Sequence, residues 1–377
     1  MGNPLLDIQQ YGQSIWYDNM QRSLITSGAL KRLVDDDGLR GMTSNPAIFE
    51  KAITGSTDYD EAMQALARQQ DMDAKALYEH LAVGDIQMAT AIMASVYARS
   101  NKRDGYVSLE VSPHLAHDTA GTIAEARRLW HAVDHPNVMI KVPATPAGIP
   151  AIQQLISEGI NVNVTLLFAM AVYEQVAEAY IAGVEALVAR GRDPRGVASV
   201  ASFFISRIDT AVDNLIEARL KTAQGTEEQL LRSLLGKVAI ANARLTYQRY
   251  QAIYDTARWQ ALAAQGAQTQ RLLWASTSTK NPTYRDVMYV EELIGPDTVN
   301  TMPTATFDAF RDHGRARASL EEHLEAAHDT METLERVGIA MQEVTNKLLE
   351  EAVKLFVDPF DKLLSAVEEK MAGATRS

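Results

Sequence analysis

Eight short apolar segments alternate along this chain with long amphipathic stretches, and this alternation limits the folds that the chain can adopt. The short segments have the length and side-chain pattern of buried strands, whereas the stretches between them have apolar residues at helical spacing. Strands that alternate with helices form parallel sheets, and eight such units predict an α/β fold, a closed (β/α)8 TIM barrel. The predicted strands are residues 13–18, 38–44, 105–111, 137–143, 160–167, 197–205, 271–276 and 298–303.

The stretches between the strands predict helices, among them residues 60–99, 118–133, 169–190 and 207–221. Two further segments exceed what a minimal barrel needs, namely a helical insert at 222–268 and a C-terminal helical extension at 316–372. The chain has no repeat of fixed period and no low-complexity linker, so we expect a single domain over residues 1–377.

The C-terminal extension has apolar residues at helical spacing, at Leu334, Val337, Met341, Val344, Leu348 and Leu355. We expect Pro359 to end or kink this helix, and the segment DKLLSAVEEK to restart one. The pattern favours a helix that packs on the barrel, and the alternative is a helix that binds a partner.

Composition excludes several classes of function. The chain has 36 Lys and Arg against 48 Asp and Glu, a net charge of −12, whereas nucleic acids and anionic membranes require basic surfaces. We therefore expect no nucleic-acid partner, and a few local cations must hold any anionic ligand. The absence of cysteine excludes disulfides, thiolate catalysis and cysteine metal sites.

The motifs of nucleotide, metal and membrane binding are missing as well. No G-x-G-x-x-G follows the first strand, and neither a P-loop nor an H-E-x-x-H motif occurs, so we predict no nucleotide cofactor and no metal. The start MGNPLLDIQQYGQS lacks the basic and apolar regions of a signal peptide, and Leu6 breaks the myristoylation pattern. No uninterrupted apolar run approaches ~18 residues, so we expect a cytoplasmic protein without a membrane partner.

The alternation of side chains along the strands, called parity below, indicates where an active site lies. Side chains alternate between the two faces of a strand, and barrel active sites lie where inward residues reach the carboxyl end. In segment 137–143, Val138, Ile140 and Val142 share one face, which leaves Lys141 on the other. The same parity places further polar residues near the ends of their strands, opposite the apolar face: Asp18, Glu110, Asn163 and Thr165.

Lys141 is the most informative of these residues. Flanked by apolar neighbours, it must be paired with an acid or lose its charge, and an uncharged amine is the nucleophile of Schiff-base chemistry. The alternatives are a lysine on an edge strand that reaches solvent, or one held in a structural ion pair.

The other polar residues have two interpretations each. Glu110 and Asp18 are candidate acid and base groups, or structural partners of Lys141. Thr165 and Asn163 either orient a water or are satisfied polar groups of the core.

An anionic part of a substrate requires cations. Arg207 follows one strand, and Ser276 and Lys280 follow the next, where late βα loops of barrels often bind phosphate. The alternative for Arg207 is a surface arginine paired with Asp209 or Asp213.

In combination, nine segments of the chain resemble the transaldolase family, in its longer bacterial form, over about residues 8–372. Any one of them is weak evidence, but together and in this order they are specific. They are SIWYDNMQR, GMTSNPAIF, VSLEVSPHLAHD, VMIKVPATPAGI, GINVNVTLLFAMA, SFFISRIDT, WASTSTKNP, VNTMP and DPFDKLL.

The resemblance implies a barrel of the class I aldolase type, in which Lys141 on the fourth strand forms the Schiff base. It implies transfer of a dihydroxyacetone unit from sedoheptulose 7-phosphate to glyceraldehyde 3-phosphate, giving erythrose 4-phosphate and fructose 6-phosphate, in the non-oxidative pentose phosphate pathway. No cofactor or metal is implied, and we expect a monomer or homodimer. Asp18 would take the proton of the donor C4 hydroxyl, while Glu110 and Thr165 would hold a proton-shuttling water.

The same resemblance implies residues that bind the substrate. Those around the dihydroxyacetone unit are Thr43, Asn45, Asn163, Ser202 and Phe204. Arg207 and Ser276 would bind phosphate. Shorter members have an arginine two residues after this serine, where this chain has Ser278, so we expect Lys280 to supply the cation.

Two other functions remain possible on this scaffold. One is an aldolase that releases free dihydroxyacetone from fructose 6-phosphate, although such relatives tend to have glutamine in place of Glu110. The other is a barrel without catalysis that serves in binding, which the intact set of polar residues disfavours.

Overall fold

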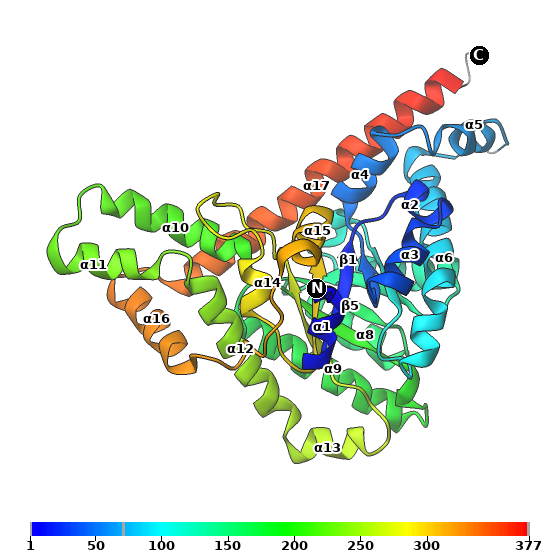
Figure 1. The fold of residues 1–377 in the computed structure, drawn as a ribbon. Coiled ribbons are helices and arrows are strands. Elements are labelled where there is room, and N and C mark those ends of the chain that lie inside the picture. Colours follow the sequence, from blue (N-terminus) through cyan, green and yellow to red (C-terminus); the bar gives the residue numbers. More distant parts are fainter. Residues whose placement is uncertain (1, 70–71, 375–377) are drawn as a thin grey trace.

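Residues 2–69 and 72–374 are described by the computed structural model of this chain. Its eight strands are parallel and follow one another in order around a closed barrel, so the predicted fold is confirmed (Figure 1). Each predicted segment contains one of the strands. They are β1 (Gln13–Asp18), β2 (Gly41–Thr43), β3 (Tyr106–Glu110), β4 (Val138–Pro143), β5 (Val162–Leu167), β6 (Ser199–Phe204), β7 (Arg271–Ala275) and β8 (Thr298–Met302).

Helices surround the barrel (Figure 1). Most lie between successive strands, whereas α1 and the turn η1 precede β1 and α15 follows β8. The predicted stretch 60–99 forms two helices, and its residues 70 and 71 lie outside the described part. The stretches 118–133, 169–190 and 207–221 form one helix each, α7, α9 and α10. These barrel helices are α1 (Pro4–Asp7), α2 (Arg22–Thr26), α3 (Ala29–Asp36), α4 (Pro46–Thr54), α5 (Asp60–Gln69), α6 (Ala74–Arg99), α7 (Thr119–Val133), α8 (Gly148–Ser157), α9 (Met170–Ala189), α10 (Ser206–Leu220), α14 (Met288–Glu292) and α15 (Thr304–His313), with short 3-10 turns η1 (Ile8–Tyr11), η2 (Pro113–Leu115) and η3 (Pro194–Gly196).

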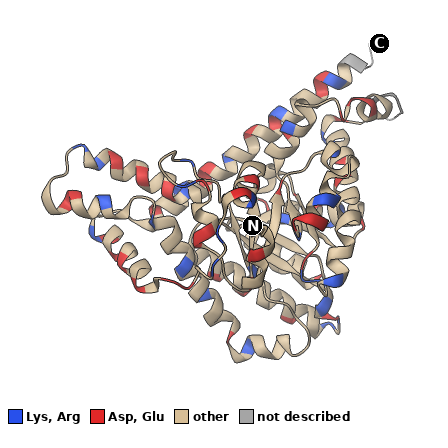
Figure 2. Ribbon diagram, in the orientation of Figure 1, with Lys and Arg blue, Asp and Glu red and all other residues tan. Residues whose placement is uncertain are grey.

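Most charged residues lie on the helices and loops around the barrel (Figure 2). The strands contain only four charged residues. Asp18, Glu110 and Lys141 lie at or near the carboxyl ends of their strands, whereas Arg271 begins β7. Arg271 forms a buried ion pair with Asp104 at 2.9 Å, at the amino end of the barrel. The other three charged residues of the strands therefore lie at the opposite, carboxyl end of the barrel.

Below that end, side chains fill the barrel interior. Trp16 is fully buried, and its ring lies 6.4 Å from that of Tyr106. A Cβ atom on Gly41 would come within 2.4 Å of the Trp16 ring, so only glycine fits there. The filled interior leaves the carboxyl end as the place for a cavity.

The segment 222–268 forms three helices outside the barrel, α11 (Gly225–Leu234), α12 (Val238–Tyr254) and α13 (Ala257–Ala263). α12 packs against α9 and α10. Asp209 of α10 joins the insert to the barrel, because its two carboxylate oxygens accept hydrogen bonds from the Ala239 amide at 2.7 Å and the Tyr289 hydroxyl at 2.8 Å. Burial raises the pKa of Asp209 to about 7, against the effect of these hydrogen bonds.

This raised pKa makes stability depend on pH. Between pH ~4, where an unfolded aspartate titrates, and pH ~7, the folded chain retains a proton that the unfolded chain has lost, so stability falls as pH rises. We expect Asp209→Asn to gain on the order of 1–3 kcal/mol relative to wild type between pH 5 and pH 8 in chemical denaturation. Asp255→Asn, at the exposed end of α12, is the control. An unchanged difference between Asp209→Asn and wild type at the two pH values would contradict the assignment.

The C-terminal extension forms two helices, α16 (Leu324–Arg336) and α17 (Met341–Ala374), and the break between them falls within the apolar pattern from Leu334 to Leu355 that indicated one helix. Gly338, with φ of +72°, separates them, because the left-handed conformation ends a helix. Four of the six predicted apolar positions are buried, but Leu355 is 52% exposed and Phe356 faces the barrel in its place.

We expected Pro359 to end or kink the helix and the segment DKLLSAVEEK to restart one. The ending and the restart are wrong, because α17 continues through Pro359 and includes this segment. Proline removes the hydrogen bond to the carbonyl of Leu355 four residues earlier, which lies on the exposed side of the helix where water can solvate it. Phe356 and Phe360 are both buried and hold this part of α17 against the barrel. α17 contacts α4, α6, α10 and β5, and Figure 1 shows it crossing the molecule diagonally (red).

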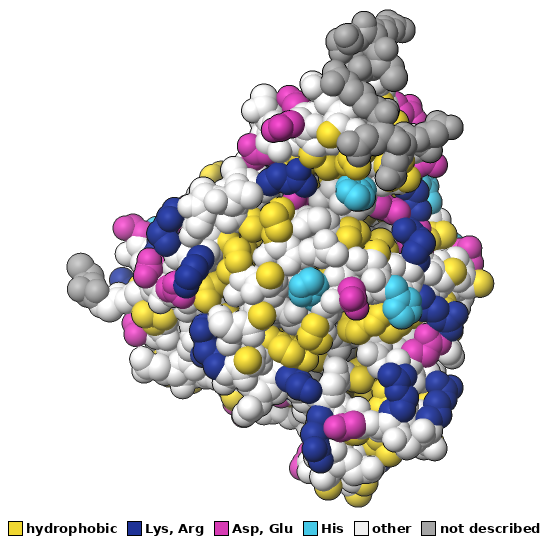
Figure 3. Space-filling model, turned by 90° about the vertical axis from the view of Figure 1, so that its right-hand side faces the viewer, with side chains coloured by type: hydrophobic (Ala, Val, Ile, Leu, Met, Phe, Trp, Pro, Cys, Tyr) yellow, Lys and Arg dark blue, Asp and Glu magenta, His cyan; other side chains and the backbone are white. Residues whose placement is uncertain are grey.

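Among the described residues, one helix, α6, is long and apolar enough to cross a membrane by length and composition alone, with a mean hydropathy of 1.3. In the structure it packs on β3. Its buried Asp85 pairs with Arg22 at 2.8 Å and accepts a hydrogen bond from Tyr59 at 2.7 Å. Figure 3 views the side of the molecule on which α6 lies in Figure 1, and apolar, histidine and charged side chains mix on this face. α6 thus occupies the position of a barrel helix between β2 and β3.

Candidate active site

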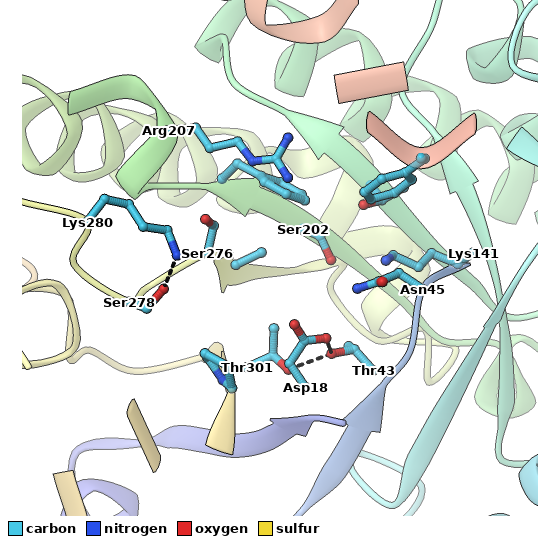
Figure 4. Close-up of a pocket in the computed structure, with 15 residues that line it drawn as sticks. Asp18, Thr43, Asn45, Lys141, Ser202, Arg207, Ser276, Ser278, Lys280 and Thr301 are labelled. Atoms are coloured by element: carbon cyan, nitrogen blue, oxygen red, sulfur yellow. Dashed lines mark hydrogen bonds between the residues drawn. The ribbon is translucent and has the colours of Figure 1, made fainter. Parts of the chain in front are cut away.

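A cavity of about 180 Å³ opens at the carboxyl end of the barrel (Figure 4). Two of the twelve predicted site residues, Glu110 and Asn163, lie behind its wall rather than in it. The other ten line it: Asp18, Thr43, Asn45, Lys141, Thr165, Ser202, Phe204, Arg207, Ser276 and Lys280. These ten residues come from five strands, β1, β2, β4, β5 and β6, and from the segments that follow β2, β6 and β7. The parity argument had selected three of them, Asp18, Lys141 and Thr165.

Lys141 lies in a closed barrel, so the alternative of an edge-strand lysine is wrong. Its side chain is 6% exposed, and its Nζ donates to the carbonyl of Ser44 at 3.2 Å. The register of β3 and β4 places Glu110 beside it, with 3.2 Å between Nζ and Oε2. Since desolvation makes a buried ion pair a poor source of stability, this pair is a candidate for chemistry.

Glu110 is buried and lies beside the side chain of Lys141. Burial raises its pKa to about 7, although the adjacent Lys141 lowers it. Its Oε2 is not aligned for a hydrogen bond with Lys141, and neither this atom nor the Thr165 hydroxyl has a hydrogen-bond partner in the described part of the chain. A carboxyl group with a pKa near 7 can both accept and donate a proton at neutral pH.

The backbone of β5 departs from regular geometry next to Thr165. The pairing of β5 with β6 shifts between Val164 and Leu167, and Leu166 has a φ of +62°. Ser276, after β7, has a φ of +55°. Left-handed conformations are uncommon for residues other than glycine and cost energy, and here both occur beside the cavity. A bulge of this kind redirects a side chain at a strand end.

Asp18 ends β1 opposite Thr43 of β2. The Thr43 hydroxyl lies 2.6 Å from Asp18 Oδ1, to which it can donate, and 2.7 Å from the hydroxyl of Thr301. Burial raises the pKa of Asp18, and Lys141 and the Thr43 hydrogen bond oppose this. Asn45 caps α4 by accepting from the amide of Ile48 at 3.0 Å, and its side chain lies beside Lys141 (Figure 4).

Asn163 supports the wall from below. Its Nδ2 donates to the hydroxyl of Ser108 at 2.9 Å, and its Oδ1 accepts from the hydroxyl of Ser202 at 2.7 Å. These bonds orient Ser202, which lines the cavity. Direct contact of Asn163 with a substrate stays a prediction.

The end of the cavity opposite Lys141 is cationic (Figure 4). Lys280 Nζ donates to the hydroxyl of Ser278 at 2.7 Å, and Arg207 lies 5.3 Å from the centre of the Phe204 ring. Burial lowers the pKa of both cations, and the positive charge of Arg207 lowers that of Lys280 further. Neither cation forms an ion pair with a residue of 2–69 or 72–374, so an anionic ligand would find both charges uncompensated.

The expected alternative partners of Arg207 are engaged elsewhere. Asp209 accepts its bonds from the insert and α14, and Asp213 accepts from the amide of Gly236 at 3.1 Å and the hydroxyl of Tyr284 at 2.7 Å. A group of at least three His, Cys, Asp or Glu side chains suited to a metal ion does not occur in the described ranges.

Five lining residues are not among the predicted site residues: Ala275, Ser278, Thr301, Pro303 and Phe356. Thr301 shares a face of β8 with Val299, so the parity argument used for the other strands would have selected Asn300 on the opposite face instead. Phe356 lines the cavity from α17 and lies 5.4 Å, at its ring centre, from Lys141 Nζ. No local pattern distinguishes this phenylalanine from the other apolar residues of its helix.

A closed barrel of eight parallel strands with a polar cavity at its carboxyl end defines a (β/α)8-barrel enzyme. The family model described as Transaldolase/Fructose-6-phosphate aldolase matches residues 15–367. The chain belongs to this family.

Its relatives are similar over almost their whole length. A protein named Transaldolase 2 from Nostoc sp. is 50% identical over 375 residues, which cover 98% of each chain. A Transaldolase from Trichodesmium erythraeum is 49% identical over 99% of each chain, and one from Thiobacillus denitrificans is 45% identical over 96% of this chain and 98% of its own. The resemblance drawn from the sequence segments is thereby confirmed.

Proposed function

We propose that this chain catalyses the transaldolase reaction, the transfer of a dihydroxyacetone unit from sedoheptulose 7-phosphate to glyceraldehyde 3-phosphate in the non-oxidative pentose phosphate pathway. The products are erythrose 4-phosphate and fructose 6-phosphate. The observation that carries the proposal is Lys141, a buried amine that lines a polar cavity and contacts a carboxylate. Relatives at 43–50% identity that are named transaldolase support the same activity.

The first step joins donor and enzyme. The uncharged amine of Lys141 adds to the C2 carbonyl carbon of the ketose, and the nitrogen then gives up a proton as the carbinolamine forms. The C2 hydroxyl next takes up a proton and leaves as water, and an iminium ion remains. Glu110 and Thr165 move these protons, because the carboxyl pKa of about 7 suits both directions and the threonine hydroxyl has no competing hydrogen-bond partner among the described residues.

The second step breaks the C3–C4 bond. Asp18 takes the proton of the C4 hydroxyl, C4 becomes the aldehyde of the departing aldose, and the bonding electrons flow to the iminium nitrogen. Burial makes Asp18 a stronger base than a surface aspartate, and Thr43 holds one of its oxygens. The neutral enamine left on Lys141 then adds through C3 to the acceptor aldehyde, and the steps reverse.

The two ends of the cavity match the two ends of a ketose phosphate. Lys141 and Asn45 lie at one end, and Arg207, Ser276 and Lys280 at the other (Figure 4). Charge-assisted hydrogen bonds from the second group would hold the phosphate. Thr43, Asn45, Ser202 and Phe204 surround the place of the dihydroxyacetone unit, and Asn163 acts through Ser202.

Borohydride reduction tests the Schiff base directly. The protein is incubated with fructose 6-phosphate, reduced, digested and analysed by mass spectrometry. We expect a stable dihydroxyacetone-derived adduct on Lys141. An adduct on another lysine would overturn the assignment, and a folded protein without any adduct would favour the barrel without catalysis.

The alternative activity is a fructose 6-phosphate aldolase, since the family model covers both names. Glu110 favours transfer, because aldolase-type relatives tend to have glutamine at the position of this glutamate. Supplying fructose 6-phosphate and erythrose 4-phosphate, and comparing the free dihydroxyacetone released with the sedoheptulose 7-phosphate formed by transfer, separates the two activities.

Lys280 provides a test of the phosphate end. We expect Lys280→Ala to raise KM for fructose 6-phosphate by roughly tenfold, the loss of one charge-assisted bond, and to change KM for unphosphorylated dihydroxyacetone little. Adding Ser278→Arg to this variant should restore part of the affinity, because a guanidinium then returns at the position of the shorter members. Lys221→Ala, an exposed lysine of the same cationic type, is the control. Equal effects on both substrates would remove Lys280 from this role.

We further propose that the chain forms one domain, acts in the cytoplasm as a monomer or homodimer, and needs neither metal nor cofactor. The packing of α12 on α9 and α10, and of α17 on β5, supports a single folded unit. The iminium itself supplies the electron sink that another enzyme would obtain from a cofactor.

A further inference from the structure

One aromatic side chain reaches the reactive amine from outside the barrel. Phe356, on α17, is 6% exposed, and its ring centre lies 5.4 Å from Lys141 Nζ. It is the one residue of α17 among those that line the cavity. Every other lining residue comes from a strand or from the loop or helix start that follows it.

α17 is held firmly across the mouth of the barrel. It contacts β5, the strand of Thr165, and also α4, α6 and α10. Near its far end, Lys370 donates to Asp60 at 2.7 Å and to the carbonyl of Ile53 at 3.2 Å. Nearer the cavity, Asp361 pairs with His114 at 2.7 Å. The position of Phe356 over the amine is therefore built into the packing of the helix.

The next turn of α17 covers the other side of the same ion pair. Phe360 packs edge to face on Tyr78 at 5.8 Å between ring centres. Together with Glu110 these residues border a second cavity of about 10 Å³, the size of one water. Phe356 thus lies beside Lys141 at the substrate cavity, whereas Phe360 borders the small space behind Glu110.

From this arrangement we infer that Phe356 shields the enamine formed on Lys141, and so makes transfer to an aldehyde faster than release of free dihydroxyacetone. The inference rests on the proposed Schiff base at Lys141. The face of the ring also attracts a cation within about 6 Å, which favours the iminium at the same place. Phe356 acts here as a positioning residue that controls access to the intermediate.

The chemistry defines what must be excluded. Release requires C3 of the enamine to take a proton, which regenerates the iminium, and then a water molecule to add at C2 and expel the amine as dihydroxyacetone forms. Transfer requires C3 to attack an aldehyde instead. An apolar ring beside the nitrogen keeps water and other proton donors from this region, so the enamine persists until the acceptor arrives.

The test measures the partition between these two outcomes. Fructose 6-phosphate is supplied without acceptor, and the rate of free dihydroxyacetone release is divided by the rate of transfer to an aldose phosphate acceptor. We expect Phe356→Ala to raise this ratio by roughly tenfold or more. Phe356→Leu, which retains an apolar side chain of similar reach, should leave the ratio within about threefold of wild type.

Two controls keep the result specific. Leu363→Ala removes a fully buried side chain from the same helix, away from the cavity, and should leave the ratio unchanged. An unchanged ratio in Phe356→Ala, an equal rise in Leu363→Ala, or a rise in Phe356→Leu as large as in Phe356→Ala would each overturn the inference. Borohydride trapping of the wild type is done first, because a missing adduct on Lys141 refutes the proposed function rather than the role of Phe356.

Discussion

Lys141→Met is expected to fold as the wild type does, to form no reducible adduct with fructose 6-phosphate, and to lose at least about 10⁴-fold in transfer activity. Methionine has nearly the reach of lysine and suits the apolar neighbours on β4. Without the cation, the pKa of Glu110 rises further, since Lys141 lowers it now, and a protonated carboxyl group is tolerated in a buried site. No other described side chain of the cavity offers an amine in the same place.

The measurements are circular dichroism for folding, mass spectrometry after borohydride reduction, and coupled assays of transfer. Lys31→Met is the matched control, because its amine is exposed and pairs only with Asp35 on the surface. Transfer activity in Lys141→Met above one hundredth of wild type would show that another group carries the chemistry.

Asp18→Asn is expected to separate bond formation from bond cleavage. The amide still accepts the hydrogen bond of Thr43, so the cavity retains its shape, but it cannot take the proton of the C4 hydroxyl. We expect kcat to fall 10²- to 10⁴-fold, the range for removal of a general base. The adduct trapped from fructose 6-phosphate should then have the mass of the intact hexose phosphate rather than that of the three-carbon unit.

Asp36→Asn, at the exposed end of α3, is the control for this substitution. If Asp18→Asn still yielded the three-carbon adduct at the rate of wild type, another base would be cleaving the bond, and the role of Asp18 would be withdrawn.

Strand order and parity are local properties of the sequence, which explains why they could be predicted. A strand places alternate side chains on opposite faces whatever its neighbours are. That rule was enough to place Lys141 inward, with Asp18 and Thr165 at strand ends of the same rim.

The wrong predictions about the C-terminal extension came from local sequence rules, whereas the helix boundaries and the inward face depend on contacts with the barrel. Proline in the interior of an isolated helix breaks or kinks it. At Pro359, burial of Phe356 and Phe360 against the barrel holds the chain in helical form on both sides of the proline. The apolar spacing of the extension indicated one helix, whereas the left-handed turn at Gly338 divides it. The register of α17 on the barrel decides which of its apolar residues face inward, and the periodicity indicated Leu355 instead.

By itself, the sequence determined the succession of strands and helices, the face on which each polar residue lies and the family of the chain. Those follow from the period of two in a strand and from the nine short segments that resemble the family in the same order. Only the tertiary structure decided how far these groups lie from one another: the 3.2 Å between Lys141 and Glu110, and the ring of Phe356 at 5.4 Å from the same amine. Such distances depend on barrel closure and helix docking, which bring together residues far apart in the chain and have no local signal.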